Sequence, residues 1–181
     1  MAKLRSANAY RRLKQPYTRR SRYREISFIK GGLHSKITMF NMGKRGGKFD
    51  TRVHIISTKS LNVRSNALEA FRQTVHRYLT KVLAEVNYYF QVKPYPHHVM
   101  RENPLAGGAG ADRFQTGMRQ AFGKPIGLAA RVHEGQEIAF LDLDLSNIKV
   151  ARDGLRRGLC KLPMATKLVV DTKKRIDKVV A

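Results

Sequence analysis

Acidic residues, tryptophan and cysteine are all scarce in this chain of 181 residues. It has 13 Asp and Glu against 36 Lys and Arg, no tryptophan, and one cysteine, Cys160. A single cysteine excludes an intramolecular disulfide framework and a cysteine-based metal cluster. No apolar run approaches the length that spans a bilayer, and no apolar stretch follows the charged N-terminus as in a secretory signal. These absences favour a soluble, intracellular protein with no membrane partner.

The shortage of acids leaves a formal net charge of +23. Self-repulsion of this size opposes compact folding unless a partner neutralises it. Nucleic acid is the usual partner of such a surplus, and an anionic membrane surface is the alternative that charge alone leaves open. Residues 1–60 contain sixteen Lys/Arg and two acids, whereas residues 134–153 contain five acids and two basic residues. We therefore expect one region to face phosphate and another to face water or a cationic neighbour.

Residues 1–34 are interpreted as a basic N-terminal extension. In its first 24 residues arginines alternate with three tyrosines and few aliphatic side chains are available for packing. This composition predicts an extended arm that orders only on a partner. Arginine can bind phosphate and tyrosine can stack on bases, although a merely solubilising tail is the alternative. The arm residues predicted to contact RNA are Arg5, Arg11, Arg12, Arg19, Arg20, Arg22 and Arg24.

The segment 35–172 is predicted to form a single α+β domain. Strand-like segments come in pairs, and the two helix-like segments do not alternate with single strands as in a parallel sheet. An antiparallel β-sheet packed by two helices is therefore expected. Strands are predicted at 35–41, 52–57, 88–93, 97–102, 128–133, 137–143 and 167–172, and helices at 65–85 and 147–160.

Both predicted helices have an apolar face and a candidate cap. In the first, Leu68, Phe71, Val75, Tyr78 or Leu79, and Val82 follow the spacing of a buried stripe. Asn66 followed by Glu69 resembles a capping box, and Ser146 is the N-cap expected for the second helix. Cys160, near the end of the second helix, is expected to be a small buried residue.

A basic turn is expected between the strands at 35–41 and 52–57. Gly43, Gly46 and Gly47 punctuate it, and the two strands with this turn predict a hairpin whose tip reaches a phosphate backbone. An ordinary solvated tip is the alternative. The tip residues predicted to contact RNA are Lys44, Arg45 and Lys48.

Two further clusters lie around residues 88–102. Tyr88, Tyr89 and Phe90 suggest a stacking platform, but alternate residues of a strand face opposite ways, so core packing of part of this run is the stronger interpretation. His97 and His98 are adjacent and would point to opposite faces of a strand, so we expect RNA contact or core packing from them and no metal site.

Residues 103–125 form a Gly- and Ala-rich stretch that is long for a loop, and such loops are usually functional or disordered. The run Gly107–Gly110 lacks the lysine and spacing of a Walker loop, so nucleotide binding is not expected. Its glycines instead suit flexibility and close backbone approach to a partner. Arg101 is predicted to anchor the first stem of this loop, and Arg113, Arg119 and Lys124 to contact RNA. A basic tail, 173–181, follows the last strand.

No arrangement of residues typical of catalysis is evident. Asp142 and Asp144 alternate with leucines and can share one face of a strand, but a solvated sheet edge explains them better than acid–base chemistry. We therefore expect no enzyme activity, and no cofactor other than Mg²⁺ as a counterion of RNA. An RNA-modifying hydrolase and a DNA-packing protein are the rival interpretations.

Three segments resemble a known family: RYREISFIKGG at 22–32, KITMFNMG at 36–43, and AGADRFQTGMRQAFGKPIGLAARVHEGQEI at 109–138. They resemble the universal L-sixteen family of large-subunit ribosomal proteins, in its archaeal and eukaryotic branch, L-ten-e. The resemblance runs over nearly the whole chain. The cysteine-containing N-terminal segment and the longer aromatic C-terminal end of eukaryotic members are missing, which favours an archaeal-type subunit.

This resemblance implies a structural constituent of the large ribosomal subunit, in cytoplasmic ribosomes. It implies an α+β domain that binds large-subunit rRNA near the A site, below the central protuberance, beside neighbouring ribosomal proteins and not as a homo-oligomer. The loop that includes Gly107, Gly108, Gly110 and Asp112 is implied to reach towards the peptidyl-transferase centre and the tRNAs in the A and P sites. A role in tRNA accommodation follows from that position.

Overall fold

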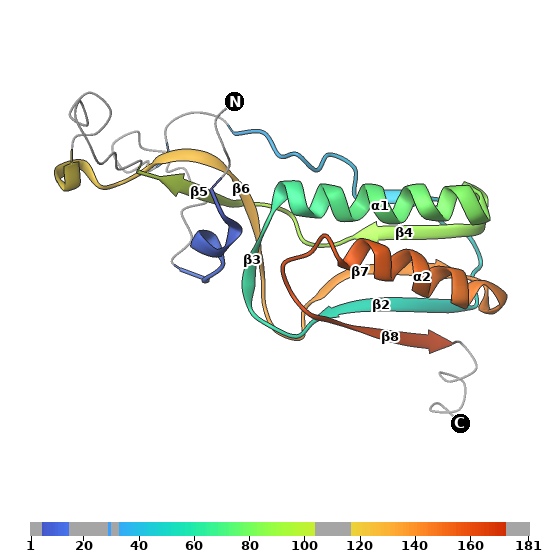
Figure 1. Cartoon of the computed structure of the whole chain (residues 1–181). Coiled ribbons are helices and arrows are strands. Elements are labelled where there is room, and N and C mark those ends of the chain that lie inside the picture. The colour runs from blue at the N-terminus through green and yellow to red at the C-terminus, as the bar shows by residue number, and fades with distance from the viewer. Residues whose placement is uncertain (1–4, 15–28, 30–32, 104–116, 173–181) are drawn as a thin grey trace.

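The computed structural model describes residues 5–14, 29, 33–103 and 117–172, and these form two helices and two antiparallel sheets (Figure 1). The α+β class is therefore confirmed. The strands are β1 (Asn41–Gly43), β2 (Thr51–Ser57), β3 (Leu61–Arg64), β4 (Tyr88–Val92), β5 (His98–Glu102), β6 (Lys124–Val132), β7 (Glu137–Leu143) and β8 (Thr166–Thr172). The helices are α1 (Ser65–Leu83) and α2 (Ile148–Leu159), with short 3₁₀ turns η1 (Ala7–Tyr10), η3 (Glu85–Asn87), η5 (Gly117–Gln120) and η6 (Leu145–Asn147).

The larger sheet has five strands in the order β1-β4-β7-β2-β8, and the smaller has three in the order β3-β6-β5. Strands β2 and β3, β4 and β5, and β6 and β7 are consecutive along the chain, and each pair passes between the two sheets. The small sheet consequently extends from one end of the large one, away from the helices (Figure 1). Among the described residues, no helix has the length and apolar character needed to cross a membrane.

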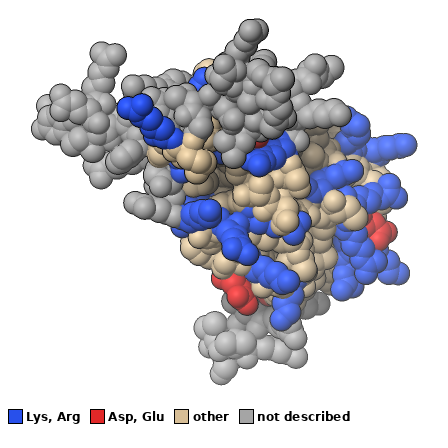
Figure 2. Space-filling view, turned by 60° about the vertical axis from the view of Figure 1, so that its left-hand side comes forward, with Lys and Arg blue, Asp and Glu red and all other residues tan. Residues whose placement is uncertain are grey.

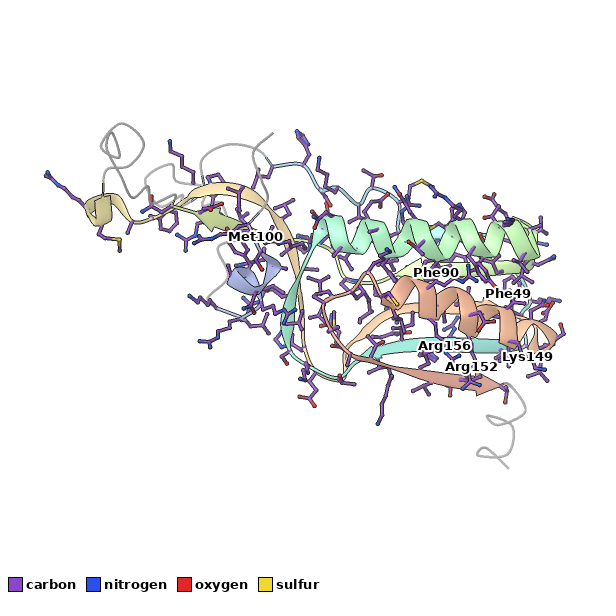
Figure 3. The ribbon with its side chains drawn as sticks, in the orientation of Figure 1. Phe49, Phe90, Met100, Lys149, Arg152 and Arg156 are labelled. Atoms are coloured by element: carbon purple, nitrogen blue, oxygen red, sulfur yellow. The ribbon has the colours of Figure 1, made fainter. Side chains whose placement is uncertain are left out.

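The hydrophobic core lies between the five-stranded sheet and the two helices, and β3 and β6 of the small sheet add Leu61, Val63, Ala130 and Val132 to it. On α1, Leu68, Phe71, Val75 and Leu79 are fully buried, which confirms most of the predicted stripe. Phe71 meets Phe90 of β4 edge to face, with ring centroids 5.8 Å apart, and Figure 3 shows Phe90 beneath the helix. Strands β2 and β4 alternate buried residues with more accessible ones because only one sheet face is covered by helices.

Two glycines allow α2 to lie close against α1. A Cβ atom on Gly158 would clash with Val75 and stand 3.0 Å from the Phe71 ring. A Cβ atom on Gly154 would stand 2.8 Å from the Tyr78 ring. The side chains of α1 thus occupy the space that larger residues on α2 would need.

The predicted hairpin between 35–41 and 52–57 is wrong. Only residues 41–43 of the first segment form a strand, and β1 pairs with β4. Strand β2 instead lies between β7 and β8. The basic segment 44–50 therefore passes the ends of β4 and β7 to connect two strands that are not neighbours. Apolar alternation indicated an extended chain, and Ile37 is indeed buried, but the pattern carries no information on pairing partners.

Several local predictions also differ from the structure. The N-cap positions are Arg64 and Asn147, without side-chain caps, and Glu69 binds Arg72 instead of closing a capping box. Val82 is 49% exposed because the buried stripe continues from Leu79 to Leu83, which packs against the core. Cys160 is exposed, since it follows the last turn of α2 on its solvent side. Strand β3 was not predicted, and β6 begins at Lys124, four residues before the predicted strand.

We predict that Gly158→Ala lowers the free energy of unfolding by about 1–3 kcal/mol, as overpacking of a filled core does. Chemical denaturation of the full-length chain measures it. The matched control is Asp153→Ala at an exposed position of α2, which should change stability by less than about 0.5 kcal/mol. A stabilised Gly158→Ala protein, as helix propensity alone would give, would show that the contact between the helices is loose.

Candidate nucleic-acid interface

Asn62 on β3 holds the N-terminal segment against the small sheet. Its side-chain Nδ2 donates hydrogen bonds to the carbonyl oxygens of Tyr10 and Arg12, both at 3.0 Å, and its backbone N–H donates to the carbonyl of Arg11 at 3.0 Å. Nearby, the Arg64 guanidinium donates to the Arg5 carbonyl at 2.5 Å and lies 5.1 Å from the centroid of the Tyr10 ring. The prediction that residues 1–24 order only on a partner is therefore wrong for residues 5–14.

A pocket of about 210 Å³, here called the arm pocket, lies between this segment and the small sheet. Met100 of β5 forms part of its wall and lies beside η1 in Figure 3. Its remaining lining is strongly basic and includes no acid. The lining residues are Arg5, Ala9, Tyr10, Arg12, Lys14, Asn62, His98, Val99, Met100 and Arg101. The predicted residues Arg5, Arg12, His98 and Arg101 are thus brought together, whereas Arg11 lies outside the pocket lining.

The two adjacent histidines differ in environment, as their opposite orientation on a strand predicts. His97 is exposed and packs on the Tyr95 ring with centroids 4.4 Å apart. His98 is 9% exposed. Burial lowers the pKa of His98, and the positive charges of Arg131 and Arg101 lower it further. His98 is therefore a neutral imidazole at neutral pH, able to offer a hydrogen bond to RNA but no charge to phosphate.

The stems of the Gly-rich segment are paired in the small sheet. Glu102 of β5 lies opposite Lys124 of β6. A Cβ atom on Gly123 would stand 2.5 Å from the Glu102 backbone, so glycine is required for this close approach. The Arg101 guanidinium lies 3.8 Å above the centroid of the Phe122 ring. Arg101 of the first stem thus contacts the second stem.

A second basic surface lies at the other end of the large sheet. Lys44, Arg45 and Lys48 are exposed in the β1–β2 connection, which leaves the sheet at the same end as the connection into α2. Figure 3 shows Lys149, Arg152 and Arg156 along one side of α2, and all three are exposed. Lysine and arginine also predominate over acids on the face seen in Figure 2.

The sequence interpretation missed the α2 row because it followed only the apolar face of that helix. The spacing i, i+3, i+7 of Lys149, Arg152 and Arg156 places them on one helical face and was available in the sequence.

The face of the five-stranded sheet opposite the helices, here called the open face, is different in character. Arg52 binds Asp142 through two hydrogen bonds of 2.6 and 2.8 Å. His54 Nδ1 lies 2.6 Å from Glu137, which also accepts from Lys93. Although burial alone would raise it, the pKa of Glu137 is lowered by the hydrogen bonds from Lys93 and His54. Asp142 and Glu137, two of the acids expected to face water or a cationic neighbour, therefore form ion pairs within the chain.

A larger hollow of about 470 Å³ lies beside the open face. Its lining carries the carboxylates of Asp50, Asp142 and Asp171 next to Arg52 and His54. This mixture of charges is unsuited to a polyanion, so the smaller arm pocket is the better candidate for RNA contact.

The other predicted site residues are distributed as follows. Arg119 of η5 and Lys124 of β6 are exposed beyond the arm pocket, on the stem side of the Gly-rich segment. Nine predicted residues lie outside the described part of the chain: Arg19, Arg20, Arg22, Arg24, Gly107, Gly108, Gly110, Asp112 and Arg113.

Comparison with known proteins identifies one family. Residues 13–169 match the family model of ribosomal protein L16p/L10e. The chain is 43% identical to large ribosomal subunit protein uL16 of Hyperthermus butylicus over 166 residues, 92% of this chain and 89% of the relative. It is 38% identical to the protein of the same name from Archaeoglobus fulgidus, over 91% of each chain. The corresponding Caldivirga maquilingensis protein is 38% identical over 97% of this chain and 98% of the relative.

The lowered pKa of His98 predicts that acid destabilises the fold. Below the ordinary histidine pKa of about 6.5 the unfolded chain binds a proton that folded His98 does not, so the free energy of unfolding falls as pH falls from that value towards the folded pKa. Denaturation between pH 7 and pH 5 measures this slope. We expect a shallower slope in His98→Leu than in the wild type. Equal slopes in the two proteins would contradict the prediction.

Proposed function

The chain belongs to the L16p/L10e family of ribosomal proteins, and we propose that it binds large-subunit rRNA near the A site, below the central protuberance, and assists tRNA accommodation. It is a structural constituent of the large subunit and not an enzyme. It acts in translation as part of the cytoplasmic ribosome.

The observation that carries the proposal is the docked, basic N-terminal segment. Asn62 fixes the backbone of residues 10–12, so the neighbouring cations are held in place before RNA arrives. Arg12 and Lys14 are exposed, and neither takes part in an ion pair within the described part of the chain. Preorganised, unpaired cations bind phosphate and release its counterions with little ordering cost.

The α2 surface supplies a second point of attachment. Lys149, Arg152 and Arg156 form a row along a rigid helix, so they can follow a phosphate backbone without rearrangement. Two basic surfaces at opposite ends of the body recognise the shape of folded rRNA, because their separation is set by the protein core. Mg²⁺ enters this proposal only as a counterion of the RNA.

The Gly-rich loop is proposed to work at the peptidyl-transferase side, next to tRNA. The support for this is the construction of its stems: Glu102 pairs with Lys124, and Gly123 packs on the backbone of the opposite strand. A loop that starts and ends in two paired strands can extend from the body without weakening the core. Exposed Arg119 and Lys124 provide positive charge where the loop departs.

The open face is proposed to lie beside a neighbouring ribosomal protein instead of rRNA. Its cations Arg52 and Lys93 are already paired with Asp142 and Glu137. Releasing them for phosphate would leave carboxylates facing a polyanion, which is unfavourable. Contact with a different ribosomal protein requires no second copy of this chain.

We predict that the double variant Arg12→Ala/Lys14→Ala binds large-subunit rRNA with a weaker salt dependence. Each lost phosphate contact lowers the slope of log affinity against log salt by roughly 0.7–0.9. Titrations between 50 and 300 mM salt, values chosen to span about a sixfold range, measure it. The control Arg52→Ala/Lys93→Ala removes the same charge from the open face and should change the slope far less. Equal slopes for both double variants would show that the arm cations do not contact phosphate.

Deleting Leu105 to Asp112 is expected to leave folding and subunit incorporation intact while impairing tRNA accommodation, because the stems remain paired. Incorporation is measured by sedimentation of reconstituted subunits, and accommodation by binding of aminoacyl-tRNA to the A site. A Gly–Ser replacement of equal length is the matched control for loop length. Failure of the deleted protein to enter the subunit would show that the loop is structural.

A further inference from the structure

Three buried polar atoms without a hydrogen-bond partner among the described residues belong to residues that line the arm pocket. They are the hydroxyl of Tyr10, Oδ1 of Asn62 and Nδ1 of His98. Asn62 is 7% exposed and His98 is 9% exposed, so neither side chain is simply hydrated. A buried polar atom left without a hydrogen bond destabilises the folded chain, because it has lost its hydration. Their concentration at one pocket points to a ligand that supplies the missing hydrogen bonds.

The orientation of Asn62 defines part of the chemistry of that ligand. Both donor hydrogens of its Nδ2 point to backbone carbonyls, of Tyr10 and Arg12. The opposite orientation of the amide would place Oδ1 against two carbonyl oxygens, which repel it. Oδ1 is therefore an acceptor, and the ligand must offer it an N–H or O–H donor. A phosphodiester or a carboxylate has acceptors only and cannot do so.

The cations at the pocket rim add the second requirement. Arg5 lies 3.7 Å from the Glu102 carboxylate and is partly neutralised. Arg12 and Lys14 are exposed and have no ion pair within the described residues. The ligand thus combines hydrogen-bond donors with negative charge. A nucleotide has both, since its base N–H groups and 2′-hydroxyl donate and its phosphate is an anion.

We propose that the arm pocket receives one unpaired nucleotide of the large-subunit rRNA. Its base or ribose lies against Tyr10, Asn62 and His98, and its phosphate against Arg12 and Lys14. The pocket has a volume of about 210 Å³, which is enough for a base or a ribose. Unstacked nucleotides are the parts of folded RNA that proteins read by hydrogen bonding. This proposal rests on rRNA binding as the function of the chain.

Tyr10→Phe is the sharpest test because it removes only a hydroxyl that has no hydrogen-bond partner among the described residues. Wild type and variant are titrated with protein-free large-subunit rRNA from the same organism, and the RNA is probed base by base with a chemical reagent. We expect roughly fivefold weaker binding and renewed reactivity of one unpaired nucleotide that the wild type protects. The free energy of unfolding of the variant should equal or exceed that of the wild type. The control Tyr78→Phe, on α1 at its contact with α2, should bind like the wild type.

The outcomes separate this proposal from the function on which it rests. If Tyr10→Phe binds with unchanged affinity and footprint, the nucleotide pocket is overturned while rRNA binding stands. If the wild type does not bind the rRNA, the proposed function itself fails. A defect that appears only when other ribosomal proteins are present would assign the pocket to a protein segment, and would equally overturn the proposal.

Discussion

Burial of one face of the five-stranded sheet beneath α1 and α2 is the constraint on which the rest of the molecule depends. Phe71, Val75 and Phe90 form its centre, and Gly154 and Gly158 let the two helices close over it. The chain continues from this sheet into a separate small sheet, whose strands β3 and β6 share the same core. That sheet holds the N-terminal segment and both stems of the Gly-rich loop, so the core fixes where these features lie.

The surplus of positive charge is unevenly distributed over the surface, because some cations form ion pairs with acids and others do not. On the open face, Arg52 and Lys93 are matched by Asp142 and Glu137, which leaves a surface suited to a protein neighbour. At the arm pocket and along α2, exposed cations such as Arg12 and Arg152 lack such partners within the described residues. The described surface therefore has two cationic regions separated by a more neutral one.

Local patterns predicted the elements well and their partners poorly. The spacing of Leu68, Phe71 and Val75 was sufficient to place α1, because a helix is formed by contacts close in sequence. The segment 35–41 alternates like a strand, yet the pairing of β1 depends on β4, which is nearly 50 residues away. Asn62 illustrates the same limit for the site: a single asparagine in a short strand has no sequence signature, although it holds the arm through three hydrogen bonds.

By itself, the sequence determined that the protein has an α+β fold, a nucleic-acid partner and a place in a ribosomal family, since these depend on composition, periodicity and long shared segments. Only the tertiary structure decided which basic residues act together. It brought Arg12 and Lys14 to His98 and Arg101 across more than 80 residues of chain and placed the α2 row at the opposite end. Among the described residues, it also showed three buried polar atoms without a hydrogen-bond partner, on residues that line one pocket. The physical reason is that charge and periodicity are properties of short segments, whereas a pocket is formed by segments that meet only when the core has closed.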